Sequence, residues 1–306
     1  VLGQVMLVTP QIRAAAAAVR QPVMSTDAGD HFGRLAAVWD EQAEAMNASM
    51  GRHGSAARTA LAARPGERII DVGCGPGISA VALAAEVAPD GFVAAVDVVP
   101  QMADAASRRL AEAGLPGAGV AADAGTADLV DVAGSGSAFD AVHSRFGLMF
   151  FPDPASALAN IHRAVRPGGR LAASVWQHLD RNPWMVLTNA AAARVLGIDR
   201  PPLPQPGAPG PFSMADPAET EQLLREAGFT DIRFESVEAP FLFPGDGIEA
   251  VERIMGAGPL GQAFLAADES RRGEVVAAVI DALQDHRGDA GFEVPAASWC
   301  ITAVRP

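Results

Sequence analysis

Residues 67–177 alternate between short apolar runs and longer stretches in which apolar residues recur at helical spacing. The apolar runs have strand length and predict five strands, at residues 67–72, 92–98, 117–123, 139–145 and 170–176. The stretches between them predict helices at residues 78–88, 100–113 and 155–166. Strands that alternate with helices are typical of parallel strands joined by right-handed crossovers, so this region predicts an open, doubly wound sheet.

The flanking regions follow other patterns. Before the sheet we expect two helices, at residues 31–49 and 55–63, which end at the breaker Arg64-Pro65-Gly66. After Trp176 we expect a proline-rich connector at residues 200–212, a helix at residues 216–228 and a strand at residues 230–240. A helical segment at residues 246–288 and a final strand at residues 297–305 follow. The predicted fold class is therefore α/β, Rossmann-like and doubly wound, with a mostly parallel sheet of about seven strands and an antiparallel last strand. An N-terminal helical cap and a helical insertion before the last strand complete it.

Charge and composition exclude several kinds of function. The chain carries a formal charge of −13, and all of its positive charge is arginine because the sequence contains no lysine. An acidic surface repels phosphate backbones, so we expect no nucleic-acid partner. Tyrosine is absent too, which excludes mechanisms that need a catalytic lysine or tyrosine. No apolar run reaches the roughly 18 residues of a membrane span, so we expect none.

The two cysteines, Cys74 and Cys300, lie far apart in the sequence. They form neither a disulfide framework nor a zinc-binding pattern, so we expect no metal site and a cytoplasmic location. Residues 1–23 lack the basic start of a secretory signal and are interpreted as an upstream extension or an extra helix. A homo-oligomer stays possible.

The stretch IIDVGCGPGIS, residues 69–79, places a glycine loop between a predicted strand and a predicted helix. Gly73, Gly75 and Gly77 form G-x-G-x-G, while Gly75, Gly77 and Ala80 also satisfy the G-x-G-x-x-A pattern of dinucleotide-binding loops. Asp97 ends the next predicted strand, where a carboxylate accepts hydrogen bonds from ribose hydroxyls. The loop and Asp97 together predict an adenosine-containing cofactor, either NAD or S-adenosylmethionine.

Three details favour S-adenosylmethionine over NAD. Pro76 removes a backbone N–H from the loop, whereas a pyrophosphate needs as many such donors as the loop can offer. Asp71 precedes the loop, where a carboxylate repels a diphosphate and attracts an ammonium group. The Tyr-Lys pair of short-chain dehydrogenases cannot exist in this chain.

Four consecutive segments carry a family resemblance: IIDVGCGPG, AVDVVPQM, AADA and FDAVHSRFGLMFFPDPASALANIHRAVRPGGRLAASVW. Together they resemble the successive motifs of class I S-adenosylmethionine-dependent methyltransferases. The resemblance is to the branch with the ubiquinone and menaquinone C-methyltransferases and many natural-product tailoring enzymes, and it covers residues 67–177. It implies a helical extension and lid at residues 1–66 and a cofactor-binding core at residues 67–178. Residues 179–306 then supply the connector, the helical insertion and the last two strands of the same domain.

The resemblance implies roles for individual residues around the cofactor. It places the methionine end near Asp71, Gly73, Cys74, Gly75 and Gly77, with Cys74 as a small packing residue. It implies that Asp97 holds the ribose, that Val98 and Met102 lie against the adenine, and that Asp123 and Ala124 contact the adenine edge. The resemblance also implies that Ser144 lies near the sulfonium.

Further residues are candidates for the acceptor side of the site. Arg145 is a candidate for stabilising charge on the acceptor, and His178, directly after the fifth predicted strand, is the first candidate for a general base. His31 and His53 are the next candidates. The residues expected to line the substrate pocket are Trp39, Phe146, Met149, Phe150 and Trp176.

The predicted function is in-line SN2 methyl transfer from S-adenosylmethionine, with S-adenosylhomocysteine as the second product. The acceptor is expected to be a small, partly apolar molecule, such as a secondary metabolite or a quinone-like ring. Two alternatives stay open: an NAD-dependent oxidoreductase, and a regulatory protein that binds S-adenosylmethionine without turnover. The sequence does not specify the acceptor or the methylated atom.

Overall fold

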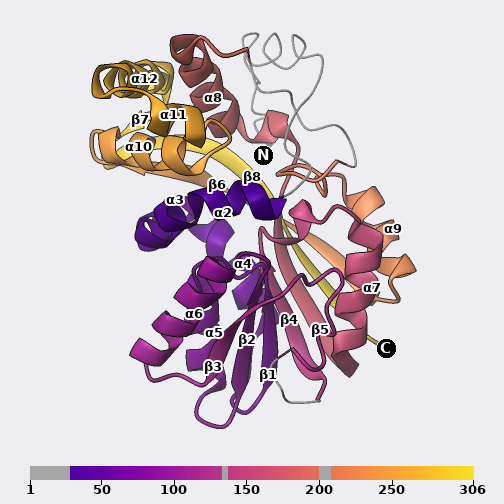
Figure 1. The fold of residues 1–306 in the computed structure, drawn as a ribbon. Helices are drawn as coiled ribbons and strands as arrows, with labels where there is room; N and C mark the ends of the chain where they lie inside the picture. The colour runs from indigo at the N-terminus through magenta and orange to yellow at the C-terminus, as the bar shows by residue number, and fades with distance from the viewer. Residues whose placement is uncertain (1–27, 133–136, 200–207) are drawn as a thin grey trace.

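The computed structural model describes residues 28–132, 137–199 and 208–306. These residues form an α/β fold around a single twisted sheet (Figure 1). The expectation for residues 1–23 and the first part of the expected proline-rich connector lie outside the described residues.

The sheet has the strand order β3-β2-β1-β4-β5-β8-β6, with the two-residue strand β7 paired to β8. Its first five strands are parallel to one another, and β8 runs antiparallel between β5 and β6. The bounds are β1 Arg68–Val72, β2 Phe92–Asp97, β3 Gly117–Ala121, β4 Phe139–Arg145, β5 Val165–Trp176, β6 Thr230–Pro244, β7 Arg287–Gly288 and β8 Gly291–Val304. The predicted fold class is confirmed, with eight strands where about seven were expected.

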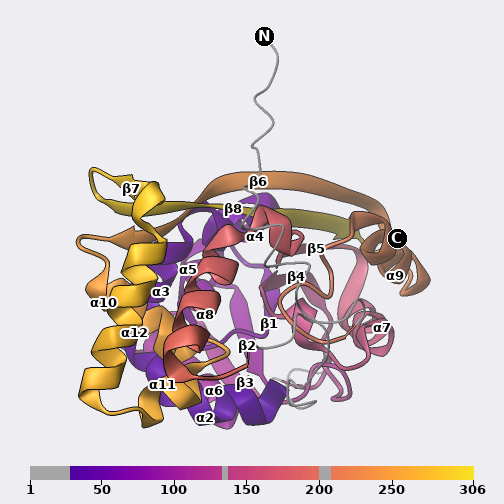
Figure 2. The same cartoon turned by 90° about the horizontal axis from the view of Figure 1, so that it is seen from above.

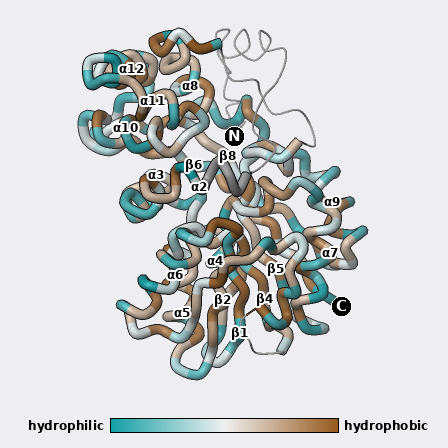
Figure 3. Tube along the Cα trace, in the orientation of Figure 1, coloured by the Kyte–Doolittle hydropathy of each residue, from teal (hydrophilic) through white to brown (hydrophobic). Residues whose placement is uncertain are grey.

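Alternate residues of each strand face two separate helical layers. Ile69 of β1 packs into the core formed with α4 (Arg52–Leu61), α5 (Ile78–Val87) and α6 (Pro100–Glu112). Its neighbour Ile70 packs into the core formed with α7 (Pro154–Ala164) and α9 (Pro217–Glu226). Both faces of the central strands β1 and β2 are therefore buried, which explains why these two strands are mostly hydrophobic (Figure 3).

The pair β6–β8 extends beyond the end of β5. Strand β5 pairs with β8 only as far as Trp176 with Ser298, whereas β6 stays paired with β8 to Pro244 and Gly291. Figure 2 shows these two long strands running past the sheet to the helical insertion. The insertion contains α10 (Ile248–Ala257), α11 (Gly261–Ala266) and α12 (Glu269–Ala282), and α12 packs against α8 (Pro183–Leu196). This extension places the insertion above the sheet (Figure 1).

Within the described residues, three helices precede β1 where two were expected: α2 (Ala28–Glu41), α3 (Ala43–Met50) and α4. The helix expected at residues 31–49 is divided at Gln42, and the expected break before α4 falls at Gly51, where the backbone has a φ of 49°. Helix α8 was missed by the sequence analysis, although Asn182-Pro183 is a normal helix start with proline in the first turn.

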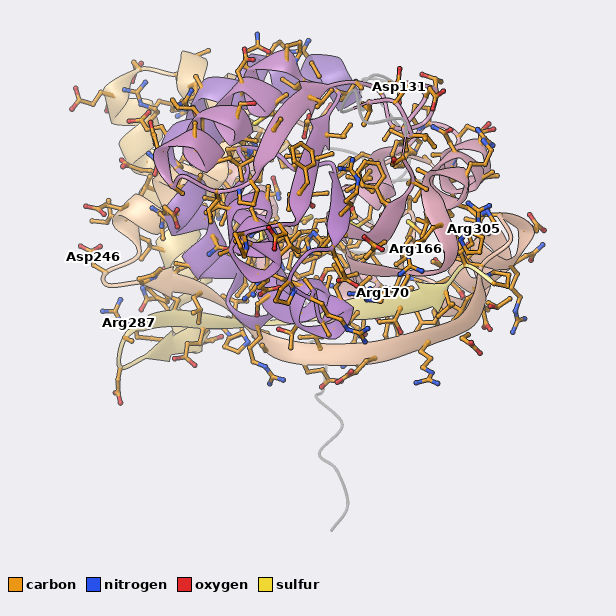
Figure 4. All side chains as sticks on the ribbon, turned by 90° about the horizontal axis from the view of Figure 1, so that it is seen from below. Asp131, Arg166, Arg170, Asp246, Arg287 and Arg305 are labelled. Carbon is orange, nitrogen blue, oxygen red and sulfur yellow. The ribbon has the colours of Figure 1, made fainter. Side chains whose placement is uncertain are left out.

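The opposite edge of the sheet, at the amino ends of the parallel strands, is closed by arginines. Arg170 donates to both carboxylate oxygens of Glu67, at 2.8 and 2.7 Å, and Arg166 donates to Asp140 at 2.6 Å. Arg305 donates to the carbonyl oxygens that end α7. These three arginines lie on the same side of the molecule (Figure 4). The carboxylates and carbonyl groups at this edge are thus engaged in hydrogen bonds from arginine. The binding site is therefore sought at the opposite edge, at the carboxyl ends of the parallel strands.

No helix among the described residues combines the length and the apolar character that crossing a membrane requires.

Gly119 of β3 tests the packing of α6 on the sheet. A Cβ atom at this position would overlap the backbone carbonyl of Ala103 in α6. We therefore expect Gly119→Ala to lower the free energy of unfolding by about 3 kcal/mol, the upper end for overpacking. Gly273 in α12 has no atom near the same position, so Gly273→Ala should raise it by about 0.5–1 kcal/mol. Urea denaturation measures both, and equal effects of the two substitutions would contradict the packing described.

Candidate functional site

A cavity of about 370 Å³ opens at the carboxyl ends of the parallel strands. Its lining includes the loop after β1, the end of β2 and the loops after β3 and β4. The end of β5, helices α2, α3, α8 and α10 and the extension of β6 also contribute to the lining. A cavity of this size at this edge is the usual ligand site of a doubly wound sheet.

The glycine loop uses its own N–H groups. Gly73 and Cys74 both donate to the carbonyl of Val96, at 2.9 and 3.1 Å, and Gly77 donates to the carbonyl of Cys74 at 3.1 Å. Gly75 donates to the carboxylate of Asp97 at 2.9 Å. Because Pro76 has no N–H, every backbone donor from residue 73 to residue 77 is already engaged within the protein.

Two glycines of this loop are required by close packing. A Cβ atom on Gly73 would lie 2.9 Å from the Cα atom of Gly147, in the loop after β4. A Cβ atom on Gly77 would lie 2.6 Å from the Cα atom of Ala106 in α6. Gly77 does not line the cavity, and its close approach to Ala106 packs the loop against α6. Its contact with the cofactor stays a prediction.

Asp97 is the carboxylate that joins the loop to the cavity. Its second oxygen accepts from the N–H of Val99 at 2.9 Å, and its side chain lines the cavity. Burial raises the pKa of Asp97, the two backbone hydrogen bonds oppose the rise, and the negative charge of Asp71 adds to it. A ribose hydroxyl that donates to this carboxylate would stabilise its charged form.

The residues expected around an adenine come together at the same end of the cavity. Val98, half exposed, lines it with the buried Met102, and Asp123 and Ala124 follow from the loop after β3. Asp123 accepts hydrogen bonds from the N–H of Gly125 at 2.8 Å and from the hydroxyl of Thr126 at 3.1 Å. These contacts fix the direction of the Asp123 carboxylate.

Asp71 and Ser144 lie beneath the cavity. Asp71 is fully buried, and its carboxylate contacts Nδ1 of the equally buried His143 at 2.7 Å. Ser144 donates to the carbonyl of Val72 at 2.8 Å. Neither Asp71 nor Ser144 lines the cavity, so the expectation that Asp71 faces a cofactor ammonium is not supported. No local pattern pointed to His143, because its contact with Asp71 arises from the pairing of β1 with β4.

Arg145 and Phe146 bring the end of β4 into the cavity. Arg145 donates to the side-chain oxygen of Asn47 in α3 at 2.6 Å. Burial lowers the pKa of its guanidinium, while the negative charges of Asp71 and Glu44 oppose this change. Phe146 adopts a positive φ of 59°, a conformation that costs a bulky residue about 1–3 kcal/mol.

His178, the first candidate for a base, is exposed and does not line the cavity. The chain turns after Trp176, because Gln177 donates to Ser236 at 2.8 Å and Asn182 binds the carbonyls of Gln177 and His178. His53 is buried, with Nδ1 bonded to Ser298 and Nε2 to the carbonyl of Ala239. Burial lowers the pKa of His53, although the bond to Ala239 opposes this. Of His31 the structure describes only the backbone position in α2, and no histidine of the described chain lines the cavity.

Arg109 of α6 ties helix α2 to the glycine loop. It donates to the carbonyl of Pro76 at 3.0 Å, and it binds both the carboxylate and the backbone carbonyl of Asp40. Trp39, next to Asp40, lines the cavity as expected. The predicted pocket residues Phe146, Met149, Phe150 and Trp176 line it too.

Several lining residues were missed by the sequence analysis because they come from distant elements. They are Met46 and Met50 of α3, Trp184, Met185 and Asn189 of α8, Phe241 of β6, and Ile254 and Met255 of α10. A tryptophan directly after Asn182-Pro183, a normal helix start, was the one local sign for Trp184.

Residues 69–169 match the family model described as a methyltransferase domain. The chain is 30% identical over 178 residues to nocamycin O-methyltransferase of Saccharothrix syringae, which covers 56% of this chain and 61% of that protein. It is 30% identical over 155 residues to the ubiquinone/menaquinone biosynthesis C-methyltransferase of Ralstonia pickettii (strain 12J), which covers 49% of this chain and 62% of that protein. The chain therefore spans about three fifths of the length of these curated relatives.

The fold is also similar to solved structures. The crystal structure of the [4+2]-cyclase SpnF matches with a TM-score of 0.52 and 19% identity, covering 94% of this chain and 99% of that chain. At this identity the likeness concerns the fold alone.

The buried pair of Asp71 and His143 makes a prediction for stability. His143→Leu would leave the Asp71 carboxylate buried without its partner, which costs about 3–5 kcal/mol of unfolding free energy. The double substitution Asp71→Leu with His143→Leu removes both polar groups and should recover most of this loss. Chemical denaturation measures the cycle. A double variant no more stable than His143→Leu alone would contradict the interaction.

The two cysteines make a prediction for reactivity. Burial raises the pKa of Cys74 well above its ordinary value, with the charges of Asp97 and Asp71 adding to the rise, and burial raises the pKa of Cys300 to about 11. Near neutral pH both thiols are therefore protonated, so alkylation by iodoacetamide should be roughly a hundredfold slower in the native protein than in denaturant. The native rate should rise with pH. Mass spectrometry follows the reaction, and equal rates in both states would contradict the burial.

Proposed function

We propose that this chain, whose residues 69–169 form a class I S-adenosylmethionine-dependent methyltransferase domain, transfers a methyl group to a small, partly apolar acceptor. The observation that carries the proposal is the hydrogen bonding of the glycine loop. From Gly73 to Gly77, each N–H group has an acceptor inside the protein, and Pro76 has no N–H.

This loop favours adenosine with a sulfonium over a dinucleotide. A pyrophosphate is held by free N–H groups at the loop and the following helix end. Residues 73–77 offer no such donor, whereas Asp97 offers a carboxylate for ribose hydroxyls beside a wall formed by Val98 and Met102. The NAD-dependent alternative therefore has less support from the residues present.

The residues present fit S-adenosylmethionine. Asp97 would hold the ribose, Met102 and Val98 would pack on the adenine, and Asp123 with Ala124 would contact its edge. When bound, S-adenosylmethionine supplies an electrophilic methyl group on a positively charged sulfur.

The chain itself then has to align the acceptor and exclude water. The apolar side chains of α3, α8 and α10 line the rest of the cavity together with Trp39 of α2, and they would exclude water from it. Holding two reactants in line can lower a barrier by several kcal/mol, with about 7–11 kcal/mol as the upper range.

The likeness to a [4+2]-cyclase is relevant to the alternative that the protein binds S-adenosylmethionine without transferring its methyl group. A fold of this kind is therefore not restricted to methyl transfer. Binding of the cofactor alone does not distinguish an enzyme from a binding protein. Formation of S-adenosylhomocysteine in the presence of an acceptor would distinguish a methyltransferase from a protein that only binds the cofactor.

Titration with S-adenosylhomocysteine and with NAD tests the cofactor. We expect the wild-type protein to bind S-adenosylhomocysteine and to bind NAD at least about tenfold more weakly. Asp97→Ala and Asp97→Asn should both lower the affinity for S-adenosylhomocysteine by about 10–100-fold, because hydrogen bonds to a charged group contribute about 1.5–3 kcal/mol. Isothermal titration calorimetry measures these affinities.

Asp131→Ala is the matched control, because Asp131 is exposed and lies outside the cavity. Thermal unfolding of the Asp97 variants separates loss of binding from loss of folding. Preferential binding of NAD, or an Asp97→Asn variant that binds S-adenosylhomocysteine as tightly as the wild type, would refute the proposal.

A further inference from the structure

Four aromatic rings form a continuous wall in the part of the cavity away from Asp97. Phe146 and Trp176 are stacked, with centroids 4.3 Å apart and planes at 15°. Trp184 and Phe241 form a second stack, at 4.1 Å and 12°. Trp176 and Trp184 join the two stacks with their centroids 5.5 Å apart. We call these four residues the aromatic wall, and all of them line the cavity.

The aromatic wall comes from four separate elements. Phe146 follows β4, Trp176 ends β5, Trp184 begins α8, and Phe241 lies on the part of β6 that extends past β5. Besides Met102, five methionines line the same cavity: Met46, Met50, Met149, Met185 and Met255. Thioethers and stacked rings favour flat, polarisable ligands over branched aliphatic ones.

Arg145 is the one cation among the residues that line this cavity in the described chain. The two carboxylates of the lining, Asp97 and Asp123, belong to the part of the cavity assigned to the cofactor. Within the described residues Arg145 has no carboxylate at ion-pair distance, and its one hydrogen bond goes to the neutral side chain of Asn47. A guanidinium has five N–H donors, so most of its hydrogen-bonding capacity is unused.

Arg145 is half-buried, and a cation that has lost much of its water without gaining a counter-charge is stabilised when a ligand supplies one. Desolvation lowers the pKa of Arg145, and the more distant charges of Asp71 and Glu44 only oppose that effect. Arg145 directly precedes Phe146 in the chain, so the cation stands beside the aromatic wall.

We propose that the aromatic wall and Arg145 bind the acceptor, and that the acceptor is a planar aromatic acid whose ionised carboxyl or phenolic oxygen pairs with Arg145. This inference rests on the proposed methyl transfer. In that reaction the bond between sulfur and the methyl carbon breaks, and its electron pair stays on sulfur. A lone pair of the anionic oxygen forms the new bond to carbon, which leaves a neutral ester or ether and a thioether.

An acceptor that is already ionised has no proton to lose at the reacting oxygen. Its methylation needs no general base, and this agrees with the described chain, in which no histidine lines the cavity. The role of Arg145 is to hold the anion beside the wall.

Intrinsic fluorescence reports binding directly. The chain has four tryptophans and no tyrosine, and three of these tryptophans, Trp39, Trp176 and Trp184, line the cavity. With the protein saturated by S-adenosylhomocysteine, three probes are titrated: 2-naphthoate, which is planar and anionic, the neutral 2-naphthalenemethanol, and decalin-2-carboxylate, which is anionic but not planar. We expect 2-naphthoate to bind at least about tenfold more tightly than either of the others.

Two substitutions separate charge from shape. Arg145→Met should lower the affinity for 2-naphthoate by about tenfold or more and change the affinity for 2-naphthalenemethanol by no more than about twofold. Arg145→Lys should retain part of the preference for 2-naphthoate over 2-naphthalenemethanol. Trp184→Leu should lower the affinity for both naphthalene probes and leave the affinity for decalin-2-carboxylate nearly unchanged. Arg181→Met is the matched control, because Arg181 is an exposed arginine outside the cavity that pairs with Glu238.

The affinity for S-adenosylhomocysteine distinguishes the two proposals. If Arg145→Met lowers the affinity for S-adenosylhomocysteine and leaves the preference for 2-naphthoate intact, Arg145 holds the carboxylate of the cofactor. The acceptor proposal is then wrong. Equal binding of the anionic and neutral naphthalene probes to the wild type would also refute it. If the wild type binds 2-naphthoate with the expected preference but does not bind S-adenosylhomocysteine, the proposed function fails instead. Thermal unfolding confirms that each variant is folded.

Discussion

The carboxylate of Asp97 is the contact on which the geometry of the cofactor end depends. It accepts from Gly75 in the loop after β1 and from Val99 at the start of α6, and so connects two neighbouring strand ends. The carbonyl of Val96, one residue earlier, accepts from Gly73 and Cys74. The loop is thereby held against β2 by its own donors, which leaves a carboxylate and a set of apolar side chains facing the cavity. A site of this kind suits a ribose and an adenine better than it suits a phosphate.

The other end of the cavity depends on the length of two strands. Because β6 and β8 continue after β5 has ended, Phe241 and the insertion helices stand above the end of the sheet. Helix α8 fills the space between them and carries Trp184 into contact with both Trp176 and Phe241. The extension therefore helps to enclose the cavity and supplies Phe241, and α8 supplies Trp184. The ends of β4 and β5 supply Phe146, Trp176 and Arg145.

The sequence was sufficient for the features that local patterns encode. Alternating strands and helices predicted the sheet, and the glycine loop with Asp97 and Met102 predicted one end of the cavity. The direction of side chains was harder to predict: Asp71 turned out to face His143 across the β1–β4 pairing, Gly77 packs on Ala106, and His178 points away after the chain turns at Gln177. The second end of the cavity combines residues from α3, α8, β6 and α10, and no local pattern relates positions so far apart in the chain.

A crystal structure with S-adenosylhomocysteine bound tests the central claim most directly, because the claim concerns which chemical groups meet at the carboxyl edge of the sheet. The account predicts that both ribose hydroxyls lie within hydrogen-bond distance of Asp97, with the adenine between Met102 and Ala124. It also predicts that the sulfur lies between the glycine loop and the aromatic wall. A ligand whose ribose lies away from Asp97, or whose adenine occupies the space beside Trp184, would contradict the account.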